Sequence, residues 1–405
     1  MIALPLLLLL SADIGSAADA ALFNRARANM ADILANQPNY ICLETIDRSE
    51  RIRAKGKFEP IDSLRFEVAY VDKRELYAWP GSKKFDETNL MDMVPEGSAI
   101  ATGAFAGHAM YLFRFNIATV KPGEWVTEDR GRFARYPFNV PKNLSHYMMM
   151  RTRTDSEIVG YSGEIWVEPN AARVTRIELH ADDIPKRLEI QSTNTVIEYS
   201  LAKVGEREFW LPSRSSEEMV TALGKTERNV TRFSGCRAFT GESTLRFDDG
   251  PIETVTPAVP AKVVDLPSGL QFEIQFDETV DSSKVHVGDP IPATLASDIK
   301  QKGEILFAKG SAVELRVVRV RHLSDWIGLD FALGEVTSPA ASARLLAIPN
   351  QLPRSRVTSG VGMLQTGSDT RRPGLGTFYI RGTHLQIRKG YRSNWTIVTP
   401  QKKAP

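Results

Sequence analysis

Alternation of apolar and polar residues dominates this chain and predicts a fold built mainly from β-strands. From Leu64 to Tyr70, every second residue is apolar, which is the period expected for a half-buried strand. Glu168 to Ala171 reads as a hairpin turn between two further strands. Strand patterns return after residue 263, where the apolar phase shifts between Val317 and Val318 and predicts a β-bulge.

Two helices are expected within the first part of the chain. Ala20 to Asn36 carries an apolar stripe at helical spacing and ends before Pro38, because the residue before proline avoids the α region. A second, weaker helix is expected from Ser98 to Phe115. Gly103 and Gly107 each cost this helix up to about 1 kcal/mol relative to alanine, so we expect it to be bent or mobile.

The N-terminal residues resemble an export signal. An apolar run from Ile2 to Leu10 is followed by the small residues Ser16, Ala17 and Ala18, which suits signal peptidase cleavage after residue 18. The run is too short for a bilayer, which needs about 20 apolar residues. It lacks a preceding Lys or Arg, so either the start lies upstream or the Met1 amine supplies the positive charge. No cysteine lies directly after the predicted cleavage site, so we expect no lipid on a new N-terminal cysteine.

The two cysteines suit an oxidising compartment. We expect Cys42 and Cys236 to form a disulfide, with two unrelated buried thiols as the alternative. Residues 249–262 are rich in proline and read as a linker. The predicted organisation is therefore a signal peptide at 1–18, a domain at 19–248, the linker, a β-domain at 263–400 and a basic tail at 401–405.

No catalytic or metal motif stands out, and we expect neither an enzyme nor a cofactor. The six histidines are scattered, without the close spacing of metal ligands. Ser297 and Lys300 match the short SxxK pattern of penicillin-interacting enzymes, but without its partner motifs. A solvated turn between strands is the alternative for that segment.

From Ala20 to Asp248 the order of elements resembles the periplasmic lipoprotein-carrier (LolA/LolB-like) fold. The resemblance rests on a helix, a strand with Tyr40 and Cys42, a meander of long strands with an inserted helix, and the segment Gly163–Pro169. It implies an open antiparallel half-barrel wrapped round one or two helices, with an apolar cavity for acyl chains. Val287–Ile291 and Ile305–Ser311 are similar to β-barrel domains of bacterial envelope and conjugation-channel proteins, which implies a small barrel or sandwich at the C-terminus.

Soft apolar residues gather near the inserted helix. Methionine adapts to varied apolar shapes, so we hypothesise a lipid-accepting cavity with the inserted helix as its lid. The proposed ligand-binding residues are Phe105, Met110, Tyr111, Phe115, Met148 and Met150. The alternative is that these side chains simply form the core.

The C-terminal end is strongly basic. Residues 350–405 carry a net charge of about +9, and the rest of the chain about −7. A basic surface formed by Arg371, Arg372, Arg381, Arg388 and Arg392 would meet an anionic membrane surface through salt-sensitive contacts. A solvated charged face is the alternative. Nucleic-acid binding is not expected, since no groove-reading motif is present.

Together these patterns predict an exported, non-enzymatic protein, periplasmic in a Gram-negative cell and otherwise secreted. Its expected partners are a lipid, an acyl chain or a lipidated protein of the cell envelope. The alternative is a structural or interaction module of an envelope assembly, with a filled core and no ligand cavity. An apolar pocket under the first sheet would favour the carrier, and convergent polar side chains in a cleft would favour an enzyme.

Overall fold

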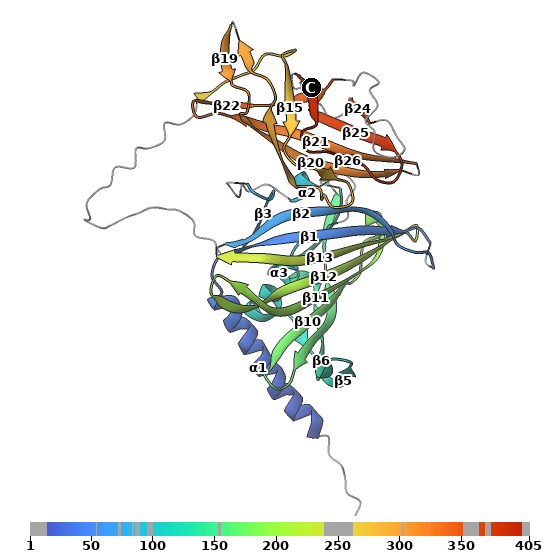
Figure 1. The fold of residues 1–405 in the computed structure, drawn as a ribbon. Helices are drawn as coiled ribbons and strands as arrows, with labels where there is room; N and C mark the ends of the chain where they lie inside the picture. The colour runs from blue at the N-terminus through green and yellow to red at the C-terminus, as the bar shows by residue number, and fades with distance from the viewer. Residues whose placement is uncertain are drawn as a thin grey trace, which may run out of the picture.

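The computed structural model describes residues 14–53, 55–71, 74–82, 85, 90–94, 100–152, 155–238, 262–301, 303–323, 325–350, 364–368 and 374–398. Most of the predicted signal peptide and the linker lie outside these residues. Residues 243–247, whose sequence predicts a further strand, and the basic tail at 401–405 also lie outside them. The prediction of a mainly β fold is confirmed, since two large sheets contain most of the described strands. Figure 1 shows these sheets one above the other.

The first part of the chain forms one helix and the first sheet, with short elements between its strands (Figure 1). Its elements are α1 (Ile14–Asn36), β1 (Tyr40–Arg51), β2 (Glu59–Val71), β3 (Arg74–Ala78), α2 (Leu90–Met93), α3 (Gly107–Ala109), the π-helix η1 (Met110–Arg114), β4 (Thr119–Val120), β5 (Glu124–Glu128), β6 (Gly131–Val140), η2 (Lys142–Leu144), β7 (Tyr147–Thr152), β8 (Asp155–Val159), β9 (Tyr161–Glu168), β10 (Arg173–Ala181), η3 (Lys186–Leu188), β11 (Ile190–Val204), β12 (Arg207–Thr221) and β13 (Thr226–Ala238).

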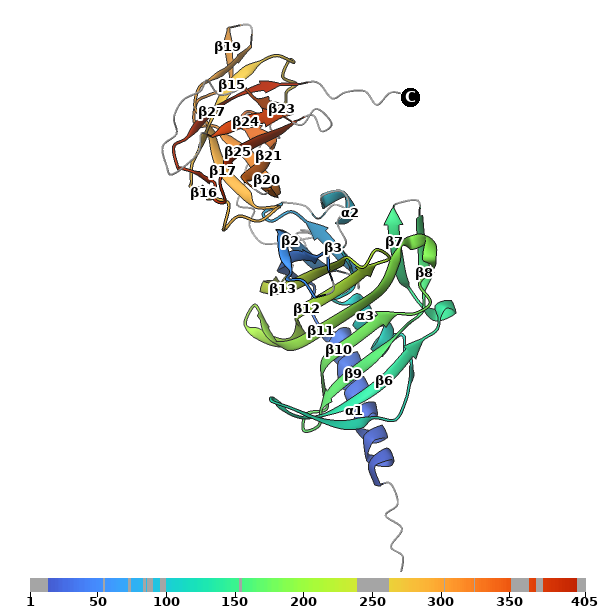
Figure 2. The ribbon, with the colours of Figure 1, turned by 90° about the vertical axis from the view of Figure 1, so that its right-hand side faces the viewer.

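The first sheet is an antiparallel meander with one long-range closure. Its strand order is β3-β2-β1-β13-β12-β11-β10-β9-β6-β4, and β5 pairs with β6. The first strand therefore lies beside the last, with Tyr40 opposite Ala238. Cys42 on β1 and Cys236 on β13 form the predicted disulfide, across 194 residues of sequence. The hairpin of β7 and β8 is a separate two-stranded sheet that stands apart from the main one in Figure 2.

Helix α1 covers one face of this sheet, called the inner face below. The predicted apolar stripe is confirmed, because Leu22, Ala26, Met30 and Leu34 are all buried. They share a core cluster with alternate residues of β6, β9, β10 and β11. The helix begins at Ile14, six residues before the predicted start. These contacts place the helix on the sheet, whereas enclosure of helices by a half-barrel stays a prediction.

The predicted second helix is short and irregular. Only Gly107–Ala109 and the π-helix Met110–Arg114 are helical among residues 100–116. Gly103 has a φ of 95°, a conformation that favours glycine, so a regular helix cannot run through it. Asn116, at a φ of 52°, ends the segment. We call residues 100–116 the cover segment, since they also lie on the inner face.

The C-terminal part forms the second large sheet and two small ones (Figure 1). Its elements are β14 (Lys262–Val263), β15 (Gln271–Phe276), β16 (Val280–Asp281), β17 (Pro290–Leu295), β18 (Ile299–Gln301), β19 (Glu304–Phe307), β20 (Ala312–Leu323), β21 (Trp326–Thr337), β22 (Ala341–Arg344), β23 (Ala347–Pro349), β24 (Gln365–Ser368), β25 (Leu375–Arg381), β26 (Gln386–Ile387) and β27 (Arg392–Ile397).

Two details of the second sheet bear on the sequence analysis. The register of β20 against β21 shifts between Val317 and Arg319, so the predicted bulge is confirmed. Residues 350–376 are rich in glycine, serine and arginine, and their sequence predicts one long loop. This prediction is wrong in part, because Gln365–Ser368 forms β24 and pairs with β25. The sequence did not predict this strand, because its side chains are small or polar and show no apolar alternation. Pairing and packing against the neighbouring strand stabilise it.

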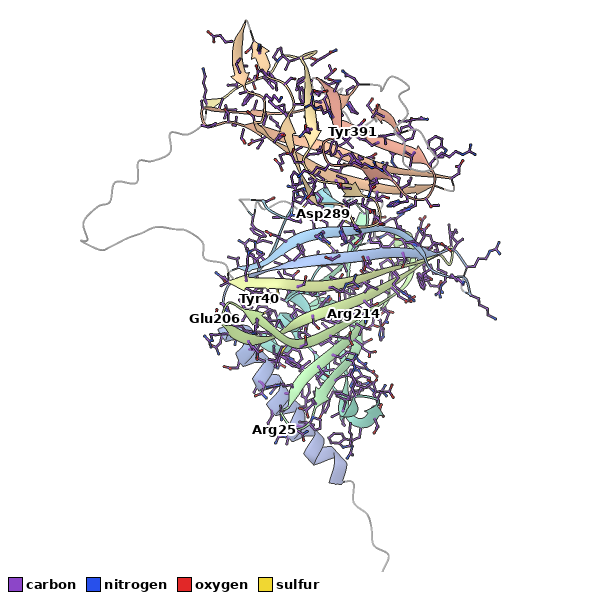
Figure 3. The ribbon with its side chains drawn as sticks, in the orientation of Figure 1. Arg25, Tyr40, Glu206, Arg214, Asp289 and Tyr391 are labelled. Atoms are coloured by element: carbon purple, nitrogen blue, oxygen red, sulfur yellow. A yellow bond between two sulfur atoms is a disulfide. The ribbon has the colours of Figure 1, made fainter. Side chains whose placement is uncertain are left out.

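The two sheets meet at β2. The backbone of Arg65 donates a hydrogen bond to Val287 at 2.7 Å, and Val287 donates to Ser63 at 2.8 Å. The Arg65 guanidinium pairs with Asp289 at 3.0 Å. Figure 3 places Asp289 where the second sheet approaches β2. A methyl group on Gly288 would lie 2.2 Å from the Arg65 carbonyl oxygen, so only glycine permits this approach.

No helix in the described part of the chain is long and apolar enough to cross a membrane.

Replacing Cys42 and Cys236 together by alanine should destabilise the protein. The disulfide closes a loop of 194 residues and restricts the unfolded chain. Losing it should lower the free energy of unfolding by about 2–5 kcal/mol, measured by urea denaturation. Reductant should lower the parent's midpoint and leave that of the variant unchanged. Equal unfolding free energies for parent and variant would contradict this expectation.

Candidate functional site

A polar band crosses the inner face of the first sheet. Register places Thr195, Glu217 and Asn229 side by side on β11, β12 and β13. On the next two strands the band continues into Arg48, opposite Asn229, and Asp62. Arg48 and Asp62 are 7% and 4% exposed and form a bidentate pair at 2.6 and 2.7 Å. Buried polar groups need partners, so this face must be covered by something that is not wholly apolar.

The cover segment lies over this band and is held by one carboxylate. Glu75 on β3 accepts backbone hydrogen bonds from Gly103 at 3.1 Å, Ala106 at 2.7 Å and Gly107 at 2.9 Å. It also accepts the hydroxyl of Tyr77 at 2.9 Å. Charge-assisted bonds of this kind are stronger than neutral ones. Glu75 therefore anchors the start of the cover segment to the sheet.

Below the anchor, the cover segment packs on aromatic rings of the sheet. Phe105 lies 5.1 Å from both Tyr40 and Phe233, measured between ring centroids. The Tyr70 hydroxyl donates to the sulfur of Met110 at 3.3 Å. The hydroxyl of Tyr40 is buried without a hydrogen-bond partner in the described structure. The surface beneath the segment is therefore amphipathic, with ring faces and unsatisfied hydroxyls together.

A small, mostly enclosed cavity of about 20 Å³ remains between the cover segment and the polar band. A cavity of that size admits one group as large as a water molecule. The lining combines two carboxyls, an imidazole, hydroxyls, an amide and a few apolar side chains: Glu44, Ile46, Ile100, Ala101, Thr102, Ala104, His108, Thr195, Ser215, Glu217, Asn229 and Thr231.

Burial perturbs the titratable groups around this cavity. Desolvation, with repulsion from Glu75, raises the pKa of Glu44 to about 8. Desolvation raises the pKa of Glu217 to about 7, although hydrogen bonds from Asn229 and the Ala101 backbone oppose the rise. Desolvation lowers the pKa of His108 to about 4, against the opposing charge of Glu75. Near neutral pH the imidazole is therefore uncharged.

The structure does not bring the six predicted ligand-binding residues into one cavity. Phe105 and Met110 are buried in two different core clusters. Tyr111 contacts Phe115, which is 60% exposed. Met148 is 55% exposed and opposes exposed Ile158 across the β7–β8 hairpin. Met150 lies on the same side of β7 as Met148, away from Tyr147, whose ring contacts His108. A shared role for these residues stays a prediction.

The predicted basic surface is only partly described. Arg371 and Arg372 lie outside the described residues. Arg381 pairs with Asp325 at 3.3 Å, and Arg392 lies 3.9 Å from Glu273. Arg388 is exposed. Acidic neighbours therefore reduce the positive field of two of these residues, and contact with an anionic membrane surface stays a prediction.

An open groove of about 440 Å³ lies on the opposite, outer face of the first sheet. Ser162 in its wall lies 3.0 Å from Nε2 of His180 and donates to Asp182 at 2.7 Å. Asp182 also approaches His180 at Nε2, at 3.7 Å. In a catalytic triad the carboxylate orients the imidazole through Nδ1. This cluster lacks that geometry, because both partners approach the same nitrogen.

Neither the SxxK match nor the metal-binding side chains form a site among the described residues. Ser297 and Lys300 do not share a helix, since Ile299–Gln301 is strand β18 and Lys300 pairs with Asp298 at 3.7 Å. Among the described residues, no group of three or more His, Cys, Asp or Glu side chains is arranged to hold a metal ion.

Sequence reasoning missed the residues that build the polar cavity. One signal was present, since Glu44 falls on the same side of its strand as Tyr40 and Cys42. A carboxylate on an apolar face indicates a buried acid. Glu75 and Glu217 gave no such signal, because their burial depends on how the cover segment lies.

Replacing Glu44 by glutamine should stabilise the protein more at pH 8 than at pH 5. The folded state keeps Glu44 protonated up to about pH 8, whereas the unfolded chain ionises it near pH 4.5. The parent therefore loses stability as the pH rises through this window, and E44Q does not incur that loss. One pKa unit corresponds to about 1.4 kcal/mol. The gain in unfolding free energy of E44Q over the parent should therefore be larger at pH 8 than at pH 5 by more than that value, measured by urea denaturation.

The control for this measurement is E206Q, at an exposed position in the turn between β11 and β12. It should follow the parent at both pH values. Titration of Glu217 and His108 affects parent and variants alike, so the comparison isolates Glu44. A pH-independent effect of E44Q would show that Glu44 is not held protonated by burial.

No family model matches the sequence, and no curated protein matches it. The structure is similar to a LolA superfamily protein from Nitrosomonas europaea, with 10% identity, covering 55% of this chain and 94% of that chain at a TM-score of 0.27. It is similar to a DUF1329 family protein from Desulfovibrio piger, with 12% identity, 57% and 97% coverage and a TM-score of 0.29.

A third similar structure is MucB in complex with MucA(peri), with 10% identity, 92% and 100% coverage and a TM-score of 0.17. Scores this low carry no argument about ligand or mechanism. The resemblance of the C-terminal part to envelope β-barrel domains stays a prediction. The sequence resemblance likewise named a LolA/LolB-like fold for the N-terminal region, and one of these similar structures is a LolA superfamily protein.

Proposed function

We propose that this chain is an exported, non-enzymatic binding protein of the cell envelope. Its ligand would be a lipid, or the acyl part of a lipidated partner, bound between the inner face of the first sheet and the cover segment. The observation that carries this proposal is the anchoring of the cover segment through Glu75 above a buried amphipathic surface. The apolar segment at Ile2–Leu10 and the Cys42–Cys236 disulfide support export to an oxidising compartment.

The cover segment is suited to move as a unit. Gly103 near its start and Asn116 at its end both have positive φ values. One of its turns is a π-helix, a feature that often occurs at functional sites. Displacing it would uncover Tyr40, Tyr70 and Phe233 without breaking a strand pairing of the sheet. An acyl chain could then replace the contacts of Phe105, and apolar burial would contribute about 25 cal/mol per Å².

The outer end of the cover segment offers a route of entry. Phe115 is exposed, and Tyr111 beside it stacks on His146 at 4.2 Å between ring centroids. Exposed Leu144 lies two residues before His146 in the chain. Apolar side chains exposed next to a movable segment suit the first contact with an acyl chain.

The second candidate is a structural or interaction module without a ligand. The small size of the cavity, about 20 Å³, favours it, because no acyl chain fits while the cover segment is closed. The two candidates differ in whether the cover segment opens.

Replacing Glu75 by glutamine should loosen the cover segment and speed ligand entry. Hydrogen bonds to a charged group contribute about 1.5–3 kcal/mol each, so we expect association with a dansyl-labelled fatty acid to become at least about tenfold faster. Stopped-flow fluorescence measures this rate, and E206Q is the matched exposed control. The parent should bind the same fatty acid saturably.

Absence of saturable binding in both the parent and E75Q, with no lipid in an organic extract of protein from its native compartment, would exclude the carrier. The second candidate, a structural or interaction module without a ligand, would then be favoured. Saturable binding with equal rates in parent and E75Q would place the ligand away from the cover segment.

A further inference from the structure

We propose that the cavity beneath the cover segment binds a primary ammonium group, carried by an amphipathic ligand such as an aminophospholipid. This inference rests on the proposed function, because the acyl chains of that ligand would occupy the neighbouring apolar surface. Burial of acyl chains alone would not distinguish one lipid headgroup from another, whereas a contact with an ammonium group would.

The cavity presents hydrogen-bond acceptors that have no donor. Glu44 is 6% exposed, and its Oε2 atom has no hydrogen-bond partner in the described structure. Thr195, 3% exposed, likewise has an unpartnered hydroxyl oxygen. Both line the cavity together with the carboxyl of Glu217. An ammonium group has three donors and no acceptor, so it matches this set.

The carboxyls also lack a positive partner within the protein. Among the described residues, no ion pair involves Glu44 or Glu217. The nearest cation in the polar band is Arg48, and both oxygens of Asp62 already engage it. His108 is the remaining basic group of the lining, and its burial keeps it neutral at physiological pH, with a pKa of about 4. A buried carboxylate without a counter-charge is costly, so Glu44 stays protonated near neutral pH while the cavity is empty. A bound ammonium group would supply the counter-charge, and Glu44 would release its proton to solvent as the ligand binds.

Cavity size restricts the kind of cation. About 20 Å³ suits a group the size of one water molecule, which an –NH₃⁺ group matches. A quaternary ammonium carries three methyl groups and is usually bound by an aromatic cage. Among the described residues that line the cavity, the imidazole of His108 is the one aromatic ring. The site should therefore distinguish ethanolamine from choline headgroups.

The cavity is not fully enclosed. Glu217 is less buried than Glu44, so the cavity is closest to solvent on the β12 side. A headgroup entering there would meet Glu217 first and Glu44 second. The backbone of Ala101, which bonds Glu217, belongs to the cover segment, so opening of that segment would widen the same path.

The experiment compares two short-chain lipids with identical acyl chains, dihexanoyl phosphatidylethanolamine and dihexanoyl phosphatidylcholine, by titration calorimetry on the full chain. We expect the ethanolamine lipid to bind at least about tenfold more tightly, the effect of one charge-assisted hydrogen bond. The double variant Glu44→Gln with Glu217→Gln should bind both lipids with the affinity that the parent has for the choline lipid. The E206Q control should keep the preference.

Different outcomes separate this inference from the proposed function. Equal affinity of the parent for both lipids would overturn the ammonium site and leave the carrier intact. Binding of neither lipid would overturn both. If ammonium or potassium chloride binds the site while the ethanolamine lipid shows no preference, the cavity takes a free monovalent cation only, and the inference fails. Thr195→Val gives a second test, since it removes one acceptor without changing charge, and it should weaken the preference.

Discussion

Coverage of the inner face by residues 100–116 is the constraint on which the N-terminal half depends. The first sheet carries buried acids and hydroxyls on the side where an ordinary sheet is apolar. Water cannot satisfy these groups without exposing Phe105, Met110 and the rings below them. Glu75 resolves the conflict by binding the backbone of the cover segment and holding it in place. One carboxylate on an edge strand thus holds the cover segment over the interior.

Much of the architecture could be predicted from the sequence, because it follows from periodicity. The stripe of α1, the register-shifting bulge near Val317 and the turn after Glu168 are local patterns with one physical solution. The cysteine pairing was also predictable, since an export signal was expected and the chain has only two thiols. Such features require no knowledge of which segments meet in space.

The candidate site was much less predictable, because it is assembled from residues far apart in the chain. Glu44, Glu75, His108 and Glu217 meet only after β1 pairs with β13 and the cover segment folds back on them. Methionine content drew attention to both Met110 and Met148, but Met110 is buried whereas strand alternation turns Met148 away from Tyr147 and leaves it exposed. Composition reports the kind of residue present, whereas the side of a strand on which it lies depends on register.

The pairing of β1 with β13 has a consequence for how this protein is made. Tyr40 and Ala238 are neighbours in space although almost two hundred residues separate them. The centre of the first sheet therefore cannot form until the last strand has left the ribosome, and contacts of such separation slow folding. A chain that stays unfolded during synthesis remains available for threading through a membrane pore. Under the proposed export, the thiols at positions 42 and 236 meet on the far side as the two strands pair, so the disulfide forms only once the sheet has closed.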